Sequence, residues 1–195
     1  MITDYTSLKT AIASHVHRGD LTASIPEFIA AAETRIYDEM RVRAMESAFS
    51  GTTASPIPSG YLEWKWLYLD TDPRLKLERR DVEWIVSRNE TGKPSFFARN
   101  ADSLIFWPSP DSTYNLVGCY YKRLDALSDS NTSNWLTTEA QPLILNAALA
   151  EVAQFTQDIE RFNAYEGRFQ QAKNRIERAD KAEGLSGSRL TTRAA

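Results

Sequence analysis

The chain has 195 residues, of which 42% are hydrophobic and 25% charged, proportions typical of a folded protein with one substantial core. Its formal net charge of -3 argues against a protein that grips nucleic acid over a broad basic surface. A single cysteine, Cys119, excludes an intrachain disulfide, and without a leader or a run of about 18 apolar residues we expect a protein of the reducing cytosol with no membrane span.

Two helices are predicted at the N-terminus. In the first, Thr6 is a candidate cap and the apolar side chains Leu8 and Ile12 share one face. The second begins with a capping box at residues 24–27, with proline in the first turn. Its apolar stripe consists of Ile25, Phe28, Ile29, Ala32, Ile36 and Met40. The opposite side, expected to face water, carries Glu33, Arg35, Asp38 and Glu39.

The middle of the chain, residues 61–123, is predicted as one inserted sheet. It holds more than half of the aromatic residues, namely Tyr61, Trp64, Trp66, Tyr68, Trp84, Phe96, Phe97, Phe106, Trp107, Tyr114, Tyr120 and Tyr121. Strand alternation predicts Trp64, Trp66 and Tyr68 on one face and Glu63, Lys65, Leu67 and Leu69 on the other. Further strands are predicted at residues 95–99, 103–107 and 113–122, and a short helix at 81–88. We expect an antiparallel meander.

Two more helices are predicted after a polar connector at residues 124–134. The first is capped by Thr137 or Thr138, has Pro142 in its opening turn and is largely buried. The second starts near Asp158 and ends at Gly184. Its seam residues lie seven apart, at Phe162, Phe169 and Ile176, as in helices that pack on neighbouring helices.

These elements predict an α+β fold. Residues 1–42 and 126–184 form a four-helix bundle, residues 43–125 form an inserted antiparallel β subdomain, and residues 185–195 form an extended, flexible C-terminal tail.

The sequence contains no recognisable catalytic, cofactor-binding or metal-binding constellation, so we predict that the chain is not an enzyme. His15 and His17 are two apart on a helix, which points them in different directions and prevents chelation of one metal. Cys119 lies in an apolar strand, where a small core residue is the better interpretation than a nucleophile. Aromatic strands also occur on platforms that bind single-stranded nucleic acid, but here acids are interleaved with the bases, which favours a packed core.

Several segments, taken in order, resemble the head-to-tail adaptor proteins of short-tailed bacteriophages, the tail tubular A or gatekeeper-like family. The matching stretches span most of the chain and lie at residues 25–43, 58–63, 92–97 and 126–149. None of them is diagnostic alone, and the order and spacing carry the resemblance. Gly60 and Asn146 depart from the residues common in the family at those places.

The resemblance implies a structural virion protein of the neck and tail, assembled in the host bacterial cytoplasm. Its partners are the portal protein, a tail nozzle or tail tube protein, and further copies of itself in a dodecameric ring. Packaged double-stranded DNA passes through the channel of that ring, without sequence-specific binding, until its ejection. No cofactor and no membrane partner are implied.

Two sets of residues are candidates for these contacts. The C-terminal segment carries basic and apolar side chains without acids, which suits an acidic portal surface; these are Leu185, Arg189, Leu190 and Arg193. Asp38 and Glu39 of one copy are candidates to meet Arg168, Lys173 or Arg175 of a neighbour, with plain solubility as the alternative role of these charges.

Two other functions stay open from the sequence. A nucleic-acid-binding packaging or regulatory protein would need an exposed basic groove and a steep salt dependence of DNA affinity. An enzyme with an unrecognised site would need a cleft of converging titratable groups.

Overall fold

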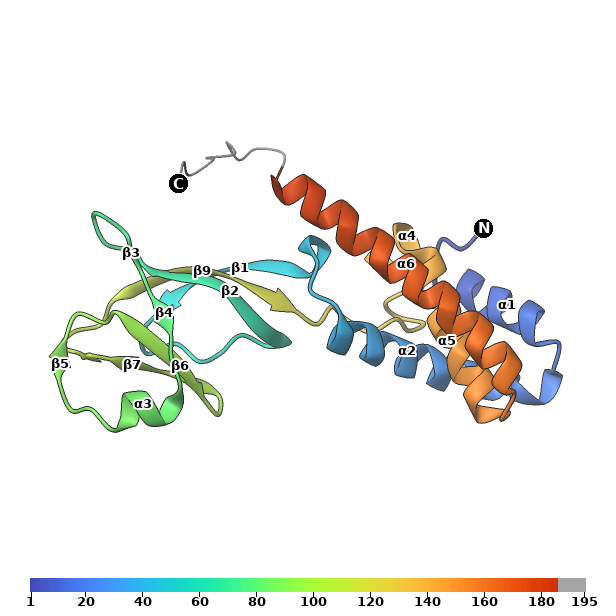
Figure 1. Cartoon of the computed structure of the whole chain (residues 1–195), viewed down its shortest axis with the longest axis horizontal. Coiled ribbons are helices and arrows are strands. Elements are labelled where there is room, and N and C mark those ends of the chain that lie inside the picture. The colour runs from blue at the N-terminus through green and yellow to red at the C-terminus, as the bar shows by residue number, and fades with distance from the viewer. Residues whose placement is uncertain (186–195) are drawn as a thin grey trace, which may run out of the picture. The chain divides into compact units, whose positions relative to one another are not determined.

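The computed structural model describes residues 1–185, and the chain divides into two compact units. Within the described part, the helical unit comprises residues 1–44 and 124–185, and the β unit comprises Met45–Arg123. From the sequence we expected the β unit to span residues 43–125. Figure 1 labels most of the elements of both units.

The helices are α1 (Tyr5–Val16), α2 (Ile25–Glu39), α3 (Val82–Val86), α4 (Trp135–Thr138), α5 (Gln141–Phe155) and α6 (Ile159–Leu185), with 3-10 turns at Gly19–Ser24 and Arg43–Met45. The strands are β1 (Glu46–Thr52), β2 (Tyr61–Leu69), β3 (Leu75–Lys76), β4 (Glu78–Arg79), β5 (Thr91–Gly92), β6 (Phe96–Asn100), β7 (Ser103–Trp107), β8 (Ser109–Pro110) and β9 (Asn115–Lys122). The mixture of helices and strands confirms the α+β class.

The caps of the helices differ from the sequence prediction. Helix α1 is capped by Asp4, whose carboxylate accepts from the Ser7 amide at 2.7 Å, and not by Thr6. Ser24 makes no capping bond, because the 3-10 turn before α2 already holds it in a helical conformation. Asn134 caps the additional short helix α4, where Thr137 or Thr138 had been expected to cap a helix.

Helix α5 is the central element of the helical unit, packed against α1, α2, α4 and α6. Its buried side chains are Leu143, Ile144, Ala147, Ala148, Leu149, Ala150, Val152 and Ala153. The predicted stripe of α2 is buried as well, from Ile25 to Met40. In α6 the seam residue Phe169 is completely buried, and the helix extends to Leu185, one residue beyond its predicted end. Small residues in α5 let its neighbours approach closely.

The β unit is not a single meander. Its main sheet has the order β1-β9-β2-β3, so that β9 returns from far along the chain to lie between β1 and β2, antiparallel to both. A second sheet has the order β4-β6-β7, and β5 pairs with β8. Strands β4 and β6 are parallel because the segment carrying α3 crosses over between them.

A β-bulge in β2 overturns the predicted alternation. Trp64 pairs with Tyr120 and Trp66 with Cys119, so Lys65 is an extra residue with no partner opposite it. The bulge shifts the pleat by one residue, which places Trp64 on the core face together with Leu67 and Leu69. Trp66 and Tyr68 consequently lie on the other face, where Trp66 is 38% exposed.

The core of the β unit lies on the face of the main sheet that Trp64 shares. Its buried members are Trp64, Leu67, Leu69, Leu77, Phe97, Leu104, Phe106, Leu116 and Tyr120. Cys119 is also buried, and burial raises the pKa of its thiol, as expected of a small structural residue. Most of the predicted aromatic cluster is therefore structural.

Candidate interaction surfaces

A network of charged side chains joins α2 to α6. Arg35 donates to Glu39 at 2.8 Å and to Glu166 at 2.6 Å, and its guanidinium lies 4.4 Å from the centre of the Phe169 ring. Lys173 donates to the second oxygen of Glu39 at 2.8 Å. Two carboxylates and two cations thus hold the helices together beside a buried aromatic ring.

The charges of this network perturb one another. The hydrogen bond from Arg35 lowers the pKa of Glu166 below its ordinary value. Partial burial acts to raise the pKa of Glu39, but the hydrogen bonds from Lys173 and Arg35 outweigh burial and lower it. Both carboxylates are therefore ionised at neutral pH and act as structural groups.

The residues expected to meet a neighbouring copy have different surroundings in the structure. Glu39 and Lys173 pair with each other within one chain. Arg168 is exposed, 5.9 Å from the centre of the Tyr165 ring, and Arg175 is exposed one heptad further along α6. Asp38 is exposed beside Glu39. Since Glu39 and Lys173 already bond within the chain, the exposed side chains of Arg168 and Arg175 are the better candidates for outside contacts.

The C-terminal candidates are mostly beyond the described residues. Leu185 is the last residue of α6. Arg189, Leu190 and Arg193 lie outside residues 1–185.

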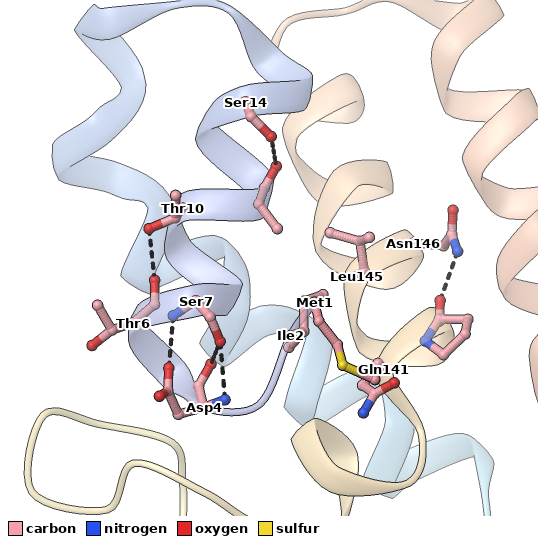
Figure 2. Close-up of a pocket in the computed structure, with 12 residues that line it drawn as sticks. Met1, Ile2, Asp4, Thr6, Ser7, Thr10, Ser14, Gln141, Leu145 and Asn146 are labelled. Carbon is pink, nitrogen blue, oxygen red and sulfur yellow. Dashed lines mark hydrogen bonds between the residues drawn. The ribbon is translucent and has the colours of Figure 1, made fainter.

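A groove of about 760 Å³ runs between α1 and the first turns of α5 (Figure 2). Several of its polar side chains bond to nearby backbone groups. Thr10 donates to the Thr6 carbonyl at 2.9 Å, Ser14 to the Ala11 carbonyl at 2.8 Å, and Asn146 to the Pro142 carbonyl at 2.6 Å. With these polar groups satisfied, the groove suits a packed apolar surface better than a polar small molecule.

The corner between α5 and α6, residues 155–160, carries two large exposed apolar side chains. Phe155 is 63% exposed and Ile159 is 75% exposed. The Phe155 ring also contacts the Phe28 ring edge-on, with ring centres 5.5 Å apart. Paired apolar side chains of this size on a helical corner are typical of a protein contact.

A second exposed apolar surface, the aromatic–basic patch, lies on the outer face of the main sheet. Its residues are Lys65, Trp66, Tyr68, Arg74, Lys76 and Val117. The Trp66 and Tyr68 rings meet at 5.6 Å in an edge-on arrangement. Lys65 pairs with Glu46 at 2.5 Å and Arg74 with Asp70 at 2.9 Å, whereas Lys76 makes no ion pair within residues 1–185. Trp, Tyr and Arg are the residues that dominate protein interfaces.

A third aromatic group joins α3 to β6 and β7. The Trp84 ring packs edge-on against Phe96 and Trp107, both with centres 5.2 Å away. The Arg88 guanidinium lies 3.8 Å from the centre of the Trp84 ring and donates to the Trp84 carbonyl at 2.9 Å. These contacts fix the short helix on its sheet and leave Val86 exposed.

One carboxylate expected on the wet face of α2 is buried instead. Glu33 is 3% exposed; its two oxygens accept from the Leu127 amide at 3.2 and 3.1 Å, and one accepts from the Asn134 side-chain amide at 3.2 Å. Burial raises the pKa of Glu33, while these hydrogen bonds act in the opposite direction. Glu33 anchors the connector before α4 to α2, a role that helical periodicity alone did not reveal.

No group of three or more histidine, cysteine or acidic side chains among residues 1–185 is placed to hold a metal ion. In the same range, no helix is long and apolar enough to cross a membrane. His15 bonds to the Ala11 carbonyl of its own helix, and His17 ends α1 in a left-handed conformation.

Sequence reasoning missed the helical corner and the aromatic–basic patch. The signal for the corner was an apolar residue on each side of the turn Thr156-Gln157-Asp158. The patch had no such signal, because only the bulge decides which tryptophan faces outward.

The chain is thus an α+β protein with structural ion pairs and several exposed apolar side chains. Residues 3–193 match the family model of the SU10 adaptor protein, and the chain belongs to that family. It is a bacteriophage structural adaptor protein, a component of the virion neck. A comparison with curated proteins gives no match.

Proposed function

We propose that the chain assembles into a ring that joins the portal to the tail nozzle or tail tube and extends the DNA channel. The observation that carries the proposal is the match to an adaptor family along nearly the whole chain, from residue 3 to residue 193. In this proposal the long helices α1, α2, α5 and α6 form a four-helix bundle, the ring is a dodecamer, and packaged DNA passes through it without sequence-specific binding.

The physical features agree with a role in assembly. Two preformed apolar surfaces, the helical corner and the aromatic–basic patch, are exposed on separate units of the chain. A net charge of -3 suits a channel in which DNA slides, because a strongly basic wall would retain it.

The C-terminal segment is the proposed contact to the portal. Arg189 and Arg193 supply positive charge and Leu190 an apolar anchor, so that docking on an acidic portal surface would combine both kinds of contact.

The experiment is native mass spectrometry of the purified chain, alone and mixed with the portal ring of the same phage. We expect about twelve copies to add to each portal, the stoichiometry that the resemblance implies. A chain that ignores the portal but forms a discrete, steeply salt-dependent complex with DNA would instead indicate a packaging or regulatory protein.

Two double variants test the proposed contact between the C-terminal segment and the portal. Replacing both arginines, R189A/R193A, is expected to weaken portal binding, whereas the neighbouring pair T191A/T192A should bind as the unmodified chain does. Full portal binding after deletion of residues 185–195 would refute the tail contact.

A further inference from the structure

The helical corner is rigid before any partner arrives. The amide of Asp158 donates to the Ala153 carbonyl at 2.9 Å, and that of Gln157 donates to the Gln154 carbonyl at 3.1 Å. Asp158 then caps α6 by accepting from the Arg161 amide at 3.0 Å. Because the turn is already fixed, burial of the exposed Phe155 and Ile159 side chains would cost little backbone entropy.

The corner also carries negative charge. Asp158 pairs with Arg161 at 3.4 Å, while Glu160, next to the exposed Ile159, makes no ion pair within residues 1–185. The corner therefore presents an apolar pair beside one uncompensated carboxylate.

The aromatic–basic patch has the complementary character. It presents the Trp66 and Tyr68 rings on a sheet, beside the uncompensated ammonium group of Lys76, which lies opposite Tyr68 in the strand register. Strand β2, which carries both rings, is held in place by antiparallel pairing with β9 on one side and β3 on the other.

The groove between α1 and α5 is a poorer receptor for the corner. No lysine or arginine lines it, and its one acidic side chain, Asp4, would repel Glu160. Charge complementarity thus selects the aromatic–basic patch.

We propose that the helical corner of one copy docks on the aromatic–basic patch of the next. Phe155 and Ile159 pack on Trp66 and Tyr68, and Glu160 lies beside Lys76. Two different surfaces meet, so the contact is heterologous and propagates from copy to copy until the ring closes. The inference rests on the proposed self-assembly and names the surfaces that carry it.

Each contact is small, and its strength in the assembly comes from repetition around the ring. Free chains are therefore expected to associate weakly, which makes chemical cross-linking the suitable measurement.

The test mixes two single-cysteine chains in a C119A background. One carries Q154C, exposed beside the corner, and the other carries S50C, exposed opposite Val117 on the outer face of the main sheet. A short bismaleimide is expected to give a heterodimer in the mixture and only monomer from either chain alone. The control, S103C on β7 of the other sheet, should stay monomeric with Q154C.

Charge reversal sharpens the test. K76E in the S50C chain, or E160K in the Q154C chain, should each lower the heterodimer yield by about threefold, and the two together should restore it. Homodimers from a single chain, or equal yields with S103C, would overturn the proposal.

Repeating the cross-linking in complexes with the portal separates the two failures. Twelve-copy addition without the 50–154 cross-link would overturn this inference and leave the ring intact, whereas absence of added copies would count against the ring itself.

Discussion

Arg35 of α2 and Glu166 of α6 form an ion pair 2.6 Å long, 131 residues apart in the chain, with the Arg35 guanidinium over the buried Phe169 ring. The pair closes the helical unit across the insertion, because α2 precedes the β unit and α6 follows it. The pair therefore contributes to the stability of the contact between the two halves of the helical unit.

Removing this pair should destabilise the helical unit. We expect R35M to lower the free energy of unfolding by about 1 to 3 kcal/mol, since hydrogen bonds to charged groups contribute that much and Glu166 would lose its main partner. Urea denaturation followed by circular dichroism measures the change. The matched control is R175M, an exposed arginine of the same helix, which should stay within about 0.5 kcal/mol of the unmodified chain.

The same network predicts loss of stability in acid. The folded-state pKa values of Glu166 and Glu39 lie below their ordinary value, so their contribution is present above the unfolded pKa of about 4.3 and is lost as the pH falls through the lower folded values. Chemical denaturation between pH 6 and 3 should show that the free energy of unfolding falls with pH. The fall should be smaller in the double variant E39Q/E166Q. An unchanged profile in that variant would contradict the assignment.

Glu33 has the opposite pH dependence. Its folded pKa is raised, so the folded state binds the proton more tightly and the contribution of this group to stability decreases as the pH rises from about 4.3 through the raised value. E33A should cost about 2 to 3 kcal/mol, because the Leu127 amide loses its buried acceptor, and E33Q should cost less. Unfolding experiments at pH 4, 6 and 8 measure the loss of stability in each variant. A loss that is the same at all three pH values would refute the role of the buried charge.

The bulge in β2 predicts unequal roles for two neighbouring tryptophans. W64A should destabilise the β unit by about 3 to 5 kcal/mol, because Trp64 is 7% exposed within the core, whereas W66A should cost about 1 kcal/mol or less. Urea unfolding of each variant measures the difference. Similar losses in the two variants would mean that β2 keeps simple alternation, which places both rings on one face.

Gly118 is required where β9 passes the bulge. A Cβ there would lie 2.8 Å from the Leu67 Cδ1 atom and 3.1 Å from the Trp66 carbonyl oxygen. We expect G118A to destabilise the chain by about 1 to 3 kcal/mol through overpacking. In contrast, G167A on the open surface of α6 should stabilise it by about 0.5 to 1 kcal/mol, and thermal unfolding of both variants checks the sign.

The sequence by itself determined the α+β class, the apolar stripe of α2, the seam residue Phe169 and the strands around residues 96–107. Each of these follows from local periodicity, because the 3.6-residue helix and the two-residue strand repeat place apolar side chains on one face wherever such an element packs.

Only the tertiary structure decided the position of β9, the burial of Glu33 and the outward face of Trp66. Strand order depends on which distant segments pair, and local pattern carries no record of that choice. A buried carboxylate depends on amides supplied some 94 to 101 residues away, and a bulge depends on the strand opposite it. The helical corner and the aromatic–basic patch became visible as surfaces only once these long-range contacts had fixed what remained outside.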